Sequence, residues 1–217
     1  MYETIIEALK GKLGENLLCA VRFGSEGQPN NFLCILEKMD FLVLEQLKET
    51  LKKEKIAPLF FTKNELQNAA DVFPLEFLDI KHPHTVLYGE DLVATIKIEK
   101  MHVRRELESE LRSKLIHLRE NYIGIKEKDL KKLLANATPS LMPLFYGLLY
   151  LENLAPPTDL NKLFDVVAEK YSFDVDILRT LKQLRDEKIK NPDLKKYVEE
   201  LLNFLQKAIG VIDKKGV

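Results

Sequence analysis

The stretch LLCAVRFGSEGQPNNFLCILE, residues 17–37, decides how the first half of this chain folds. Its two ends, LLCAVRF at 17–23 and NFLCILE at 31–37, are short apolar runs rich in residues that favour strands. Between them, GSEGQPN supplies two glycines and a proline, which is the composition of a turn. The stretch therefore predicts a strand, a turn and a second strand.

Helices and strands alternate on both sides of this unit up to about residue 100. Apolar residues at three- and four-residue spacing predict helices over 2–13 and 42–55. Further along, after the apolar APLFF (57–61), we expect a short polar helix in NELQNAA (64–70), a strand in VFPLEFLDI (72–80), and a turn at GED (89–91) followed by a strand in VATIKI (93–98). The fold class predicted for residues 1–100 is an α/β domain with a mixed sheet and flanking helices.

The pattern changes at residue 101. Leucines recur at helical spacing in a long amphipathic segment that ends at Gly124. Further helices are expected at about 126–136, 139–152, 158–171, 173–188 and 193–209. Residues 140–151 are apolar on nearly every face, which indicates a helix buried in the bundle or against the first domain, with a lipid- or ligand-binding helix as the alternative. Residues 101–217 are thus predicted to form an all-α bundle, and the whole chain an α+β protein.

The composition bounds the function. The 217 residues are 46% hydrophobic and 31% charged, with a formal net charge of -1, so the chain can bury a core and lacks the field of a dedicated nucleic-acid binder. The N-terminus has no signal-peptide pattern, and the apolar stretch 137–151, which contains Pro139 and Pro143, is shorter than the roughly twenty residues of a membrane span. We expect a cytoplasmic protein with no membrane partner, in which Cys19 and Cys34 are buried thiols.

A strand leading into Gly24-Ser25, followed by a second apolar strand, resembles the opening of the nucleotidyltransferase superfamily, the DNA polymerase beta-like fold. In that family Gly-Ser approaches the triphosphate, and Asp-h-Asp-h-h (h is apolar) on the next strand binds metal. FPLEFLDI (73–80) is similar to the family's Pro-Leu-Glu strand, whose glutamate acts as base, and Glu76 is the matching residue. The HTVLYGEDL segment (84–92) resembles the VLYG segment that follows it in bacterial relatives.

This chain departs from the family at the metal site. Asn31 and Leu33 stand at the two positions where the family has aspartates, so no metal site is assigned. Because phosphoryl transfer depends on divalent metal, the resemblance implies a catalytically impaired protein that binds nucleotide or regulates another molecule. It also implies a protein partner or a homodimer.

Two alternatives stay open. One is an active, Mg²⁺- and NTP-dependent nucleotidyltransferase with a displaced acidic site built from Glu76, Asp79 and either Glu37 or Asp40. The other is a purely structural adaptor, whose helical bundle docks a partner.

Further residues have both a functional and a plain interpretation. Arg104 and Arg105 open the long helix and, in the family's two-domain layout, are placed to clamp an anion; the interspersed glutamates favour a salt-bridged surface instead. His82 and His84, with Glu76 and Asp79 upstream, carry metal-ligand chemistry, but their spacing is not that of a closed zinc site, so loop histidines are favoured.

Overall fold

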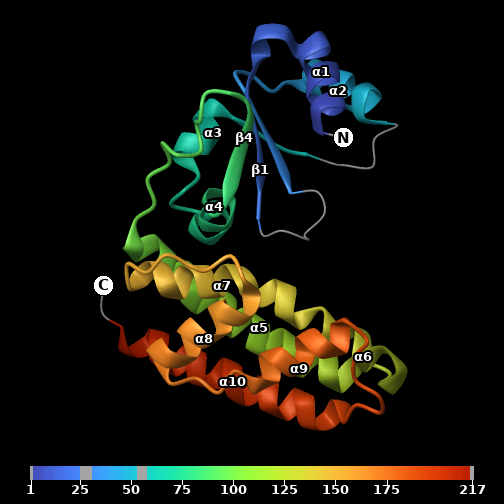
Figure 1. Ribbon diagram of the computed structural model, residues 1–217, viewed down its shortest axis with the longest axis vertical. Coiled ribbons are helices and arrows are strands. Elements are labelled where there is room, and N and C mark those ends of the chain that lie inside the picture. Colours follow the sequence, from blue (N-terminus) through green and yellow to red (C-terminus); the bar gives the residue numbers. More distant parts are fainter. Residues whose placement is uncertain (1, 25–30, 53–57, 216–217) are drawn as a thin grey trace. The chain divides into compact units, whose positions relative to one another are not determined.

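The computed structural model describes residues 2–24, 31–52 and 58–215. The chain divides into two compact units, Met1–Glu99 and Lys100–Val217 (Figure 1). Among the described residues the first unit has a four-stranded mixed sheet with helices, and the second has helices alone. The protein is therefore α+β.

The first unit contains both helices and strands, as expected, but α3 and α4 follow each other with no strand between them. Its elements are α1 (Tyr2–Leu13), the single 3₁₀ turn η1 (Gly14–Asn16), β1 (Leu17–Phe23), β2 (Phe32–Leu36), α2 (Phe41–Leu51), β3 (Leu59–Thr62), α3 (Lys63–Asn68), α4 (Pro74–Lys81) and β4 (His84–Gly89). The sheet order is β3-β2-β1-β4, in which β1 is antiparallel to both neighbours and β2 is parallel to β3. The predicted end of the second helix, from residue 53, lies outside the described residues.

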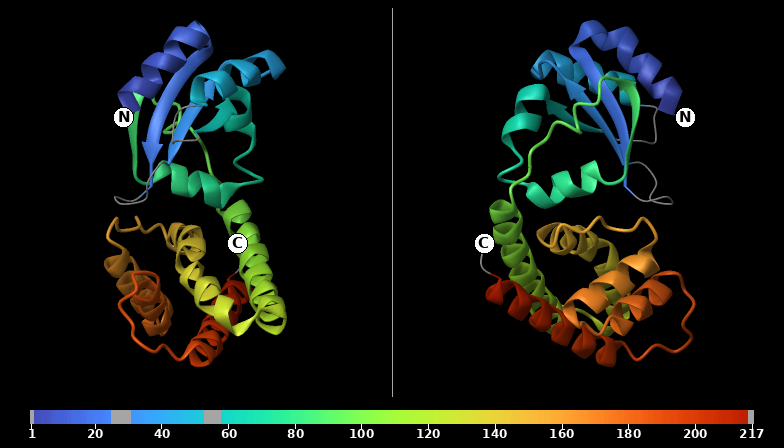
Figure 2. Two further views of the ribbon diagram at one scale, coloured as in Figure 1. Left: turned by 90° about the vertical axis from the view of Figure 1, so that its right-hand side faces the viewer. Right: turned by 60° about the vertical axis from the view of Figure 1, so that its left-hand side comes forward.

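Both faces of the central strands are buried, which explains why their sequences are apolar runs rather than alternating patterns. Successive residues of β2 alternate between two cores: Cys34 packs with α1 and α2, whereas Leu33 and Ile35 pack on the side of α3 and α4. Figure 2 shows helices on both faces of the sheet. Cys19 and Cys34 are free, buried thiols in different cores, which confirms the prediction for them.

Two predicted strands are wrong. VFPLEFLDI contains helix α4, which starts at Pro74, and it buries Phe77 and Ile80 against the sheet. Proline suits the first turn of a helix because its missing N–H would have no helical partner there. VATIKI forms turns and coil, in which Val93 and Ile96 close the same core and the Lys81 amine donates to the carbonyls of Ala94 and Ile96.

The second unit is a bundle whose described helices are α5 (Lys100–Gly124), α6 (Glu127–Ala135), α7 (Ala137–Leu151), α8 (Leu160–Tyr171), α9 (Asp176–Arg185) and α10 (Leu194–Lys214). Helix α7 contacts α5, α6, α8 and α9, and nine of its fifteen residues are buried. The nearly all-apolar segment is thus the core helix of the bundle, as one of its two interpretations predicted. The Phe145 ring packs edge-on against both Phe164 and Phe204, which ties α7 to α8 and α10.

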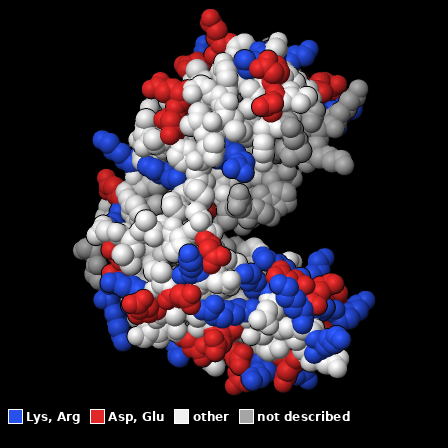
Figure 3. All heavy atoms as spheres, viewed as in Figure 1, with Lys and Arg blue, Asp and Glu red and all other residues white. Residues whose placement is uncertain are grey.

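Within the described residues, none of the helices has the length and apolarity needed to cross a bilayer. On the face of the helical unit seen in Figure 3, basic and acidic side chains are intermixed. That face therefore carries no extended field of one sign.

Candidate functional site

Three chain segments meet at one end of the sheet, which we call the Gly24 end. Here β1 finishes while β2 and β4 begin, because β1 is antiparallel to both. The N–H of Gly24 donates to the carbonyl of Pro83 at 3.0 Å, and the N–H of Phe23 donates to the carbonyl of Asn31, also at 3.0 Å. The same end carries His84, which pairs with Phe23 across the two strands.

Gly24 fits the turn that the sequence predicts. Its φ of 86° lies in the left-handed region, which glycine adopts without a Cβ penalty. Since its N–H is already bonded to Pro83, Gly24 serves this end as a turn residue rather than as an amide donor to a ligand. Ser25, the other predicted phosphate contact, lies outside the described residues.

Arg22 is a cation at this end that sequence reasoning missed. It is the one exposed residue in the burial pattern of β1, and its strand neighbours are Phe32 and Thr85. A guanidinium can donate two parallel hydrogen bonds to phosphate oxygens. The available signal was a single charge inside an otherwise apolar strand.

His84 and Asp91 form the main polar pair beside Gly24. The His84 Nε2 lies 3.1 Å from an Asp91 carboxylate oxygen, and its Nδ1 lies 2.8 Å from the Lys81 carbonyl oxygen. The ring is thus held between the Lys81 carbonyl and the Asp91 carboxylate.

Asp91 is held as a carboxylate. Burial favours the neutral acid, but the backbone N–H of Ala94 and the His84 ring more than offset this and lower the pKa of Asp91. The pair therefore fixes the start of β4 to the loop that follows it.

The structure places Leu33 in the core of the first unit. It is 0% exposed and packs with the residues beneath α3 and α4. Asn31 lies just before β2, at the Gly24 end. An acid at position 33 would be a buried charge, so strand β2 offers no metal ligand there.

Glu76 sits in the first turn of α4 with its side chain exposed, and not on a strand. Asp79 lies one turn further on, on the same side of the helix, and is half-buried. Burial, with a smaller contribution from the Glu76 charge, raises the pKa of Asp79 to about 6. Sequence reasoning named Asp79 as a candidate acid but could not predict this shift, because it depends on tertiary burial.

The two arginines belong to the second unit, and Arg104 has a structural partner. Its Nε donates to the Lys215 carbonyl at 2.7 Å, and its Nη2 lies 3.5 Å from the Ile212 carbonyl, so it caps the end of α10. It also pairs with Glu108 at 3.5 Å. Arg105 is exposed on the neighbouring position of α5.

Among the described residues, Glu76, Asp79 and either Glu37 or Asp40 do not form a group that could hold a metal ion. Glu37 and Asp40 follow the end of β2 and lie at the Leu17 end of the sheet, about 20 Å along β1 from the Gly24 end. The Asp40 carboxylate accepts from the N–H of Val43 and caps α2. Across residues 2–24, 31–52 and 58–215, no three His, Cys, Asp or Glu side chains gather in a group fit to hold a metal ion.

No protein-family model matches this chain, and the search of curated proteins found no significant match either.

Proposed function

We propose that this chain is a nucleotidyltransferase-like protein that binds a nucleotide at the Gly24 end of its sheet without transferring it, and so acts as a regulatory or interaction protein. The observation that carries the proposal is the complete burial of Leu33 at a strand position where the resemblance puts a metal-binding carboxylate. A site without that ligand cannot align a metal-bound triphosphate for in-line transfer.

The binding part of the proposal rests on the Gly24 end. Gly24, which has a positive φ and no Cβ, allows a close approach to the backbone, and the exposed Arg22 supplies a positively charged guanidinium. These are elements that phosphate recognition uses.

Thermal unfolding of the full chain with each nucleoside triphosphate tests the proposal. We expect stabilisation by at least one nucleotide, with little dependence on Mg²⁺ or Mn²⁺, because no metal ligand set is assembled among the described residues. A ligand at one hundred times its Kd adds about 2.7 kcal/mol to the free energy of unfolding.

Arg22→Gln should reduce this stabilisation, whereas the control Lys38→Gln removes an exposed cation at the opposite end of the sheet and should leave it unchanged. Labelled nucleotide should not appear on any acceptor. A metal-dependent shift of the unfolding temperature together with transfer of the label would contradict the proposed loss of catalysis. If no nucleotide shifts the unfolding temperature, the proposed nucleotide binding is wrong.

A further inference from the structure

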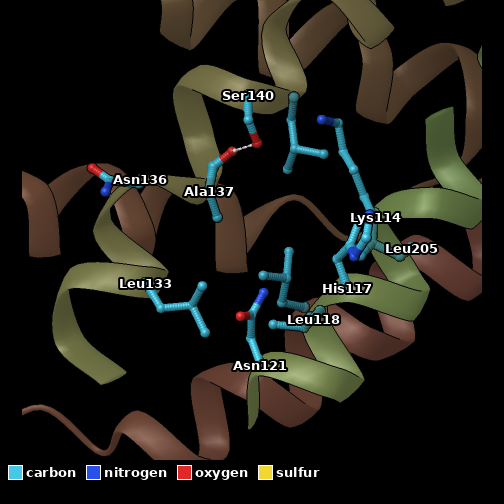
Figure 4. Close-up of a pocket in the computed structure, with 11 residues that line it drawn as sticks. Lys114, His117, Leu118, Asn121, Leu133, Asn136, Ala137, Ser140 and Leu205 are labelled. Atoms are coloured by element: carbon cyan, nitrogen blue, oxygen red, sulfur yellow. Dashed lines mark hydrogen bonds between the residues drawn. The ribbon is translucent and has the colours of Figure 1, made fainter. Parts of the chain in front are cut away.

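The helical unit contains an apolar pocket that plays no part in the site above. Its volume is about 260 Å³, and it lies between α5, the junction of α6 with α7, and α10 (Figure 4). Its apolar lining consists mainly of Leu118, Leu133, Leu141, Leu201 and Leu205. The space is a little below the roughly 300–1,000 Å³ of pockets that hold drug-sized ligands, so it suits a smaller molecule.

The polar side chains of the pocket come from two elements. Helix α5 contributes Lys114, His117 and Asn121, while the α6–α7 junction contributes Asn136 and Ser140. In Figure 4, Lys114, His117 and Leu205 lie on one side of the pocket and Leu133 lies on the other.

The charges of the lining are one-sided. It contains a lysine and a histidine but no aspartate or glutamate. The Ser140 hydroxyl already donates to the Ala137 carbonyl at 2.8 Å, so α5 supplies the groups best suited to an anion.

The two basic groups have acidic neighbours on their own helix that a ligand can replace. Lys114 Nζ lies 3.5 Å from Glu110, and His117 Nδ1 lies 3.1 Å from Glu120. His117 and Glu120 are each 66% exposed and Glu110 is 45% exposed, and ion pairs in contact with water are weak. Lys114 is more buried, with 25% of its side chain exposed, so a carboxylate in the pocket meets it in a drier setting.

We propose that this pocket binds a small amphipathic carboxylate, of about ten non-hydrogen atoms, with its apolar body on the leucines and its carboxylate against Lys114 and His117. The leucine lining selects an apolar body, and Lys114 and His117 favour a negative head group, which would replace Glu110 and Glu120 as their partner. The proposal concerns the second unit and does not depend on nucleotide binding by the first.

Octanoate is the probe, and 1-octanol and acetate are its matched controls. Titration of the full-length protein, followed by amide chemical shifts, should move the resonances of Leu118, Leu133 and Ser140. Octanoate should bind about tenfold more tightly than 1-octanol, since a charge-assisted hydrogen bond is lost with the alcohol. Acetate should not bind measurably, because it has no apolar body to bury.

Two variants separate the pocket from non-specific binding. Ser140→Phe places a ring at the exposed rim and should abolish octanoate binding, whereas Ser109→Phe, on an exposed position of α5 outside the lining, should not. Lys114→Met keeps the apolar stem and should weaken octanoate about tenfold while leaving 1-octanol unchanged. Lys131→Met, outside the lining on α6, is its control.

Equal affinity for octanoate and 1-octanol would overturn the assignment of an anionic ligand. Binding that survives Ser140→Phe in a protein with unchanged helical content would place it elsewhere. Absence of octanoate binding to the folded wild-type protein at millimolar concentration would remove the site altogether.

Discussion

At the scale of the single residue, Leu33 stands where the resemblance implies a metal-binding carboxylate. We predict that Leu33→Asp lowers the free energy of unfolding by about 3 kcal/mol or more at neutral pH, because it buries a charge in a completely enclosed position. The loss should shrink in acid, where the carboxyl is protonated. Urea unfolding at two pH values measures both effects.

Leu33→Asn is the matched control for that change, since it has nearly the same shape and no charge. Its destabilisation should be independent of pH. A stable Leu33→Asp protein with no pH dependence would show that this position tolerates a charge, which contradicts its complete enclosure.

Asp79 should make the stability of the first unit fall as the pH rises. Its folded-state pKa of about 6 is above the value of 3.8 for an ordinary aspartate, so the folded state prefers the neutral acid. Stability contributed by this group is therefore full below about pH 4 and is lost as the pH rises through 6. Asp79→Asn should be more stable than the wild type at pH 8, by about 2 kcal/mol, with no advantage near pH 4.

Chemical denaturation across pH measures the effect of Asp79→Asn, and Asp71→Asn, at an exposed position, is the control. Glu76→Gln should move the Asp79 pKa toward its ordinary value, because the Glu76 charge is one cause of the shift. An unchanged carboxyl titration in that variant would show that burial alone sets the pKa of Asp79.

At the scale of the element, Arg104 links the start of α5 to the end of α10. Arg104→Met removes a cation from the last carbonyls of a 21-residue helix, and we expect a loss of about 1 to 2 kcal/mol. Arg105→Met, one position along, should change stability by less than about 0.5 kcal/mol. Thermal unfolding measures the two losses of stability, and carbon chemical shifts at residues 212–215 report fraying of the end of α10. Equal effects of Arg104→Met and Arg105→Met would contradict the capping role of Arg104.

Helices and strands with a clear spacing of apolar residues could be predicted from the sequence. Elements that are buried on most sides could not, because they are apolar at nearly every position. Helix α1 and strand β1 have the predicted bounds because their apolar spacing or turn residues mark both ends. Helix α4 presents apolar residues in nearly every direction, so its short run is indistinguishable from a buried strand by pattern. Pro74 was the one local signal for a helix start.

The site shows the same division between local and tertiary information. A glycine turn after β1 follows from composition, and Gly24 has the backbone that such a turn requires. The His84–Asp91 pair joins two segments seven residues apart through the path of β4, which the sequence does not specify. In VATIKI, the carbonyls of Ala94 and Ile96 accept hydrogen bonds from the Lys81 amine instead of from a neighbouring strand. The sequence could not predict this contact either, because it joins segments that are apart in the chain.

At the scale of the whole molecule, the division into Met1–Glu99 and Lys100–Val217 predicts two folding units. We expect the piece Lys100–Val217, produced alone, to be helical and to unfold cooperatively by circular dichroism. Its midpoint should match a transition of the full chain that Leu33→Asp does not move. A piece that is unfolded in isolation would show that the bundle needs the first unit for its stability.

The central place of β1 in the sheet makes its amide hydrogens a measure of the stability of the first unit. Both edges of β1 are paired, with β2 on one side and β4 on the other. In the described sheet, β3 and β4 each have one edge without a strand partner. Amide hydrogens of β1 should therefore exchange with deuterium only when the first unit opens as a whole. Their exchange rate gives the free energy of unfolding of the first unit, and the exchange rate of the amides of α7 gives that of the bundle. Both values come from one sample of the full chain.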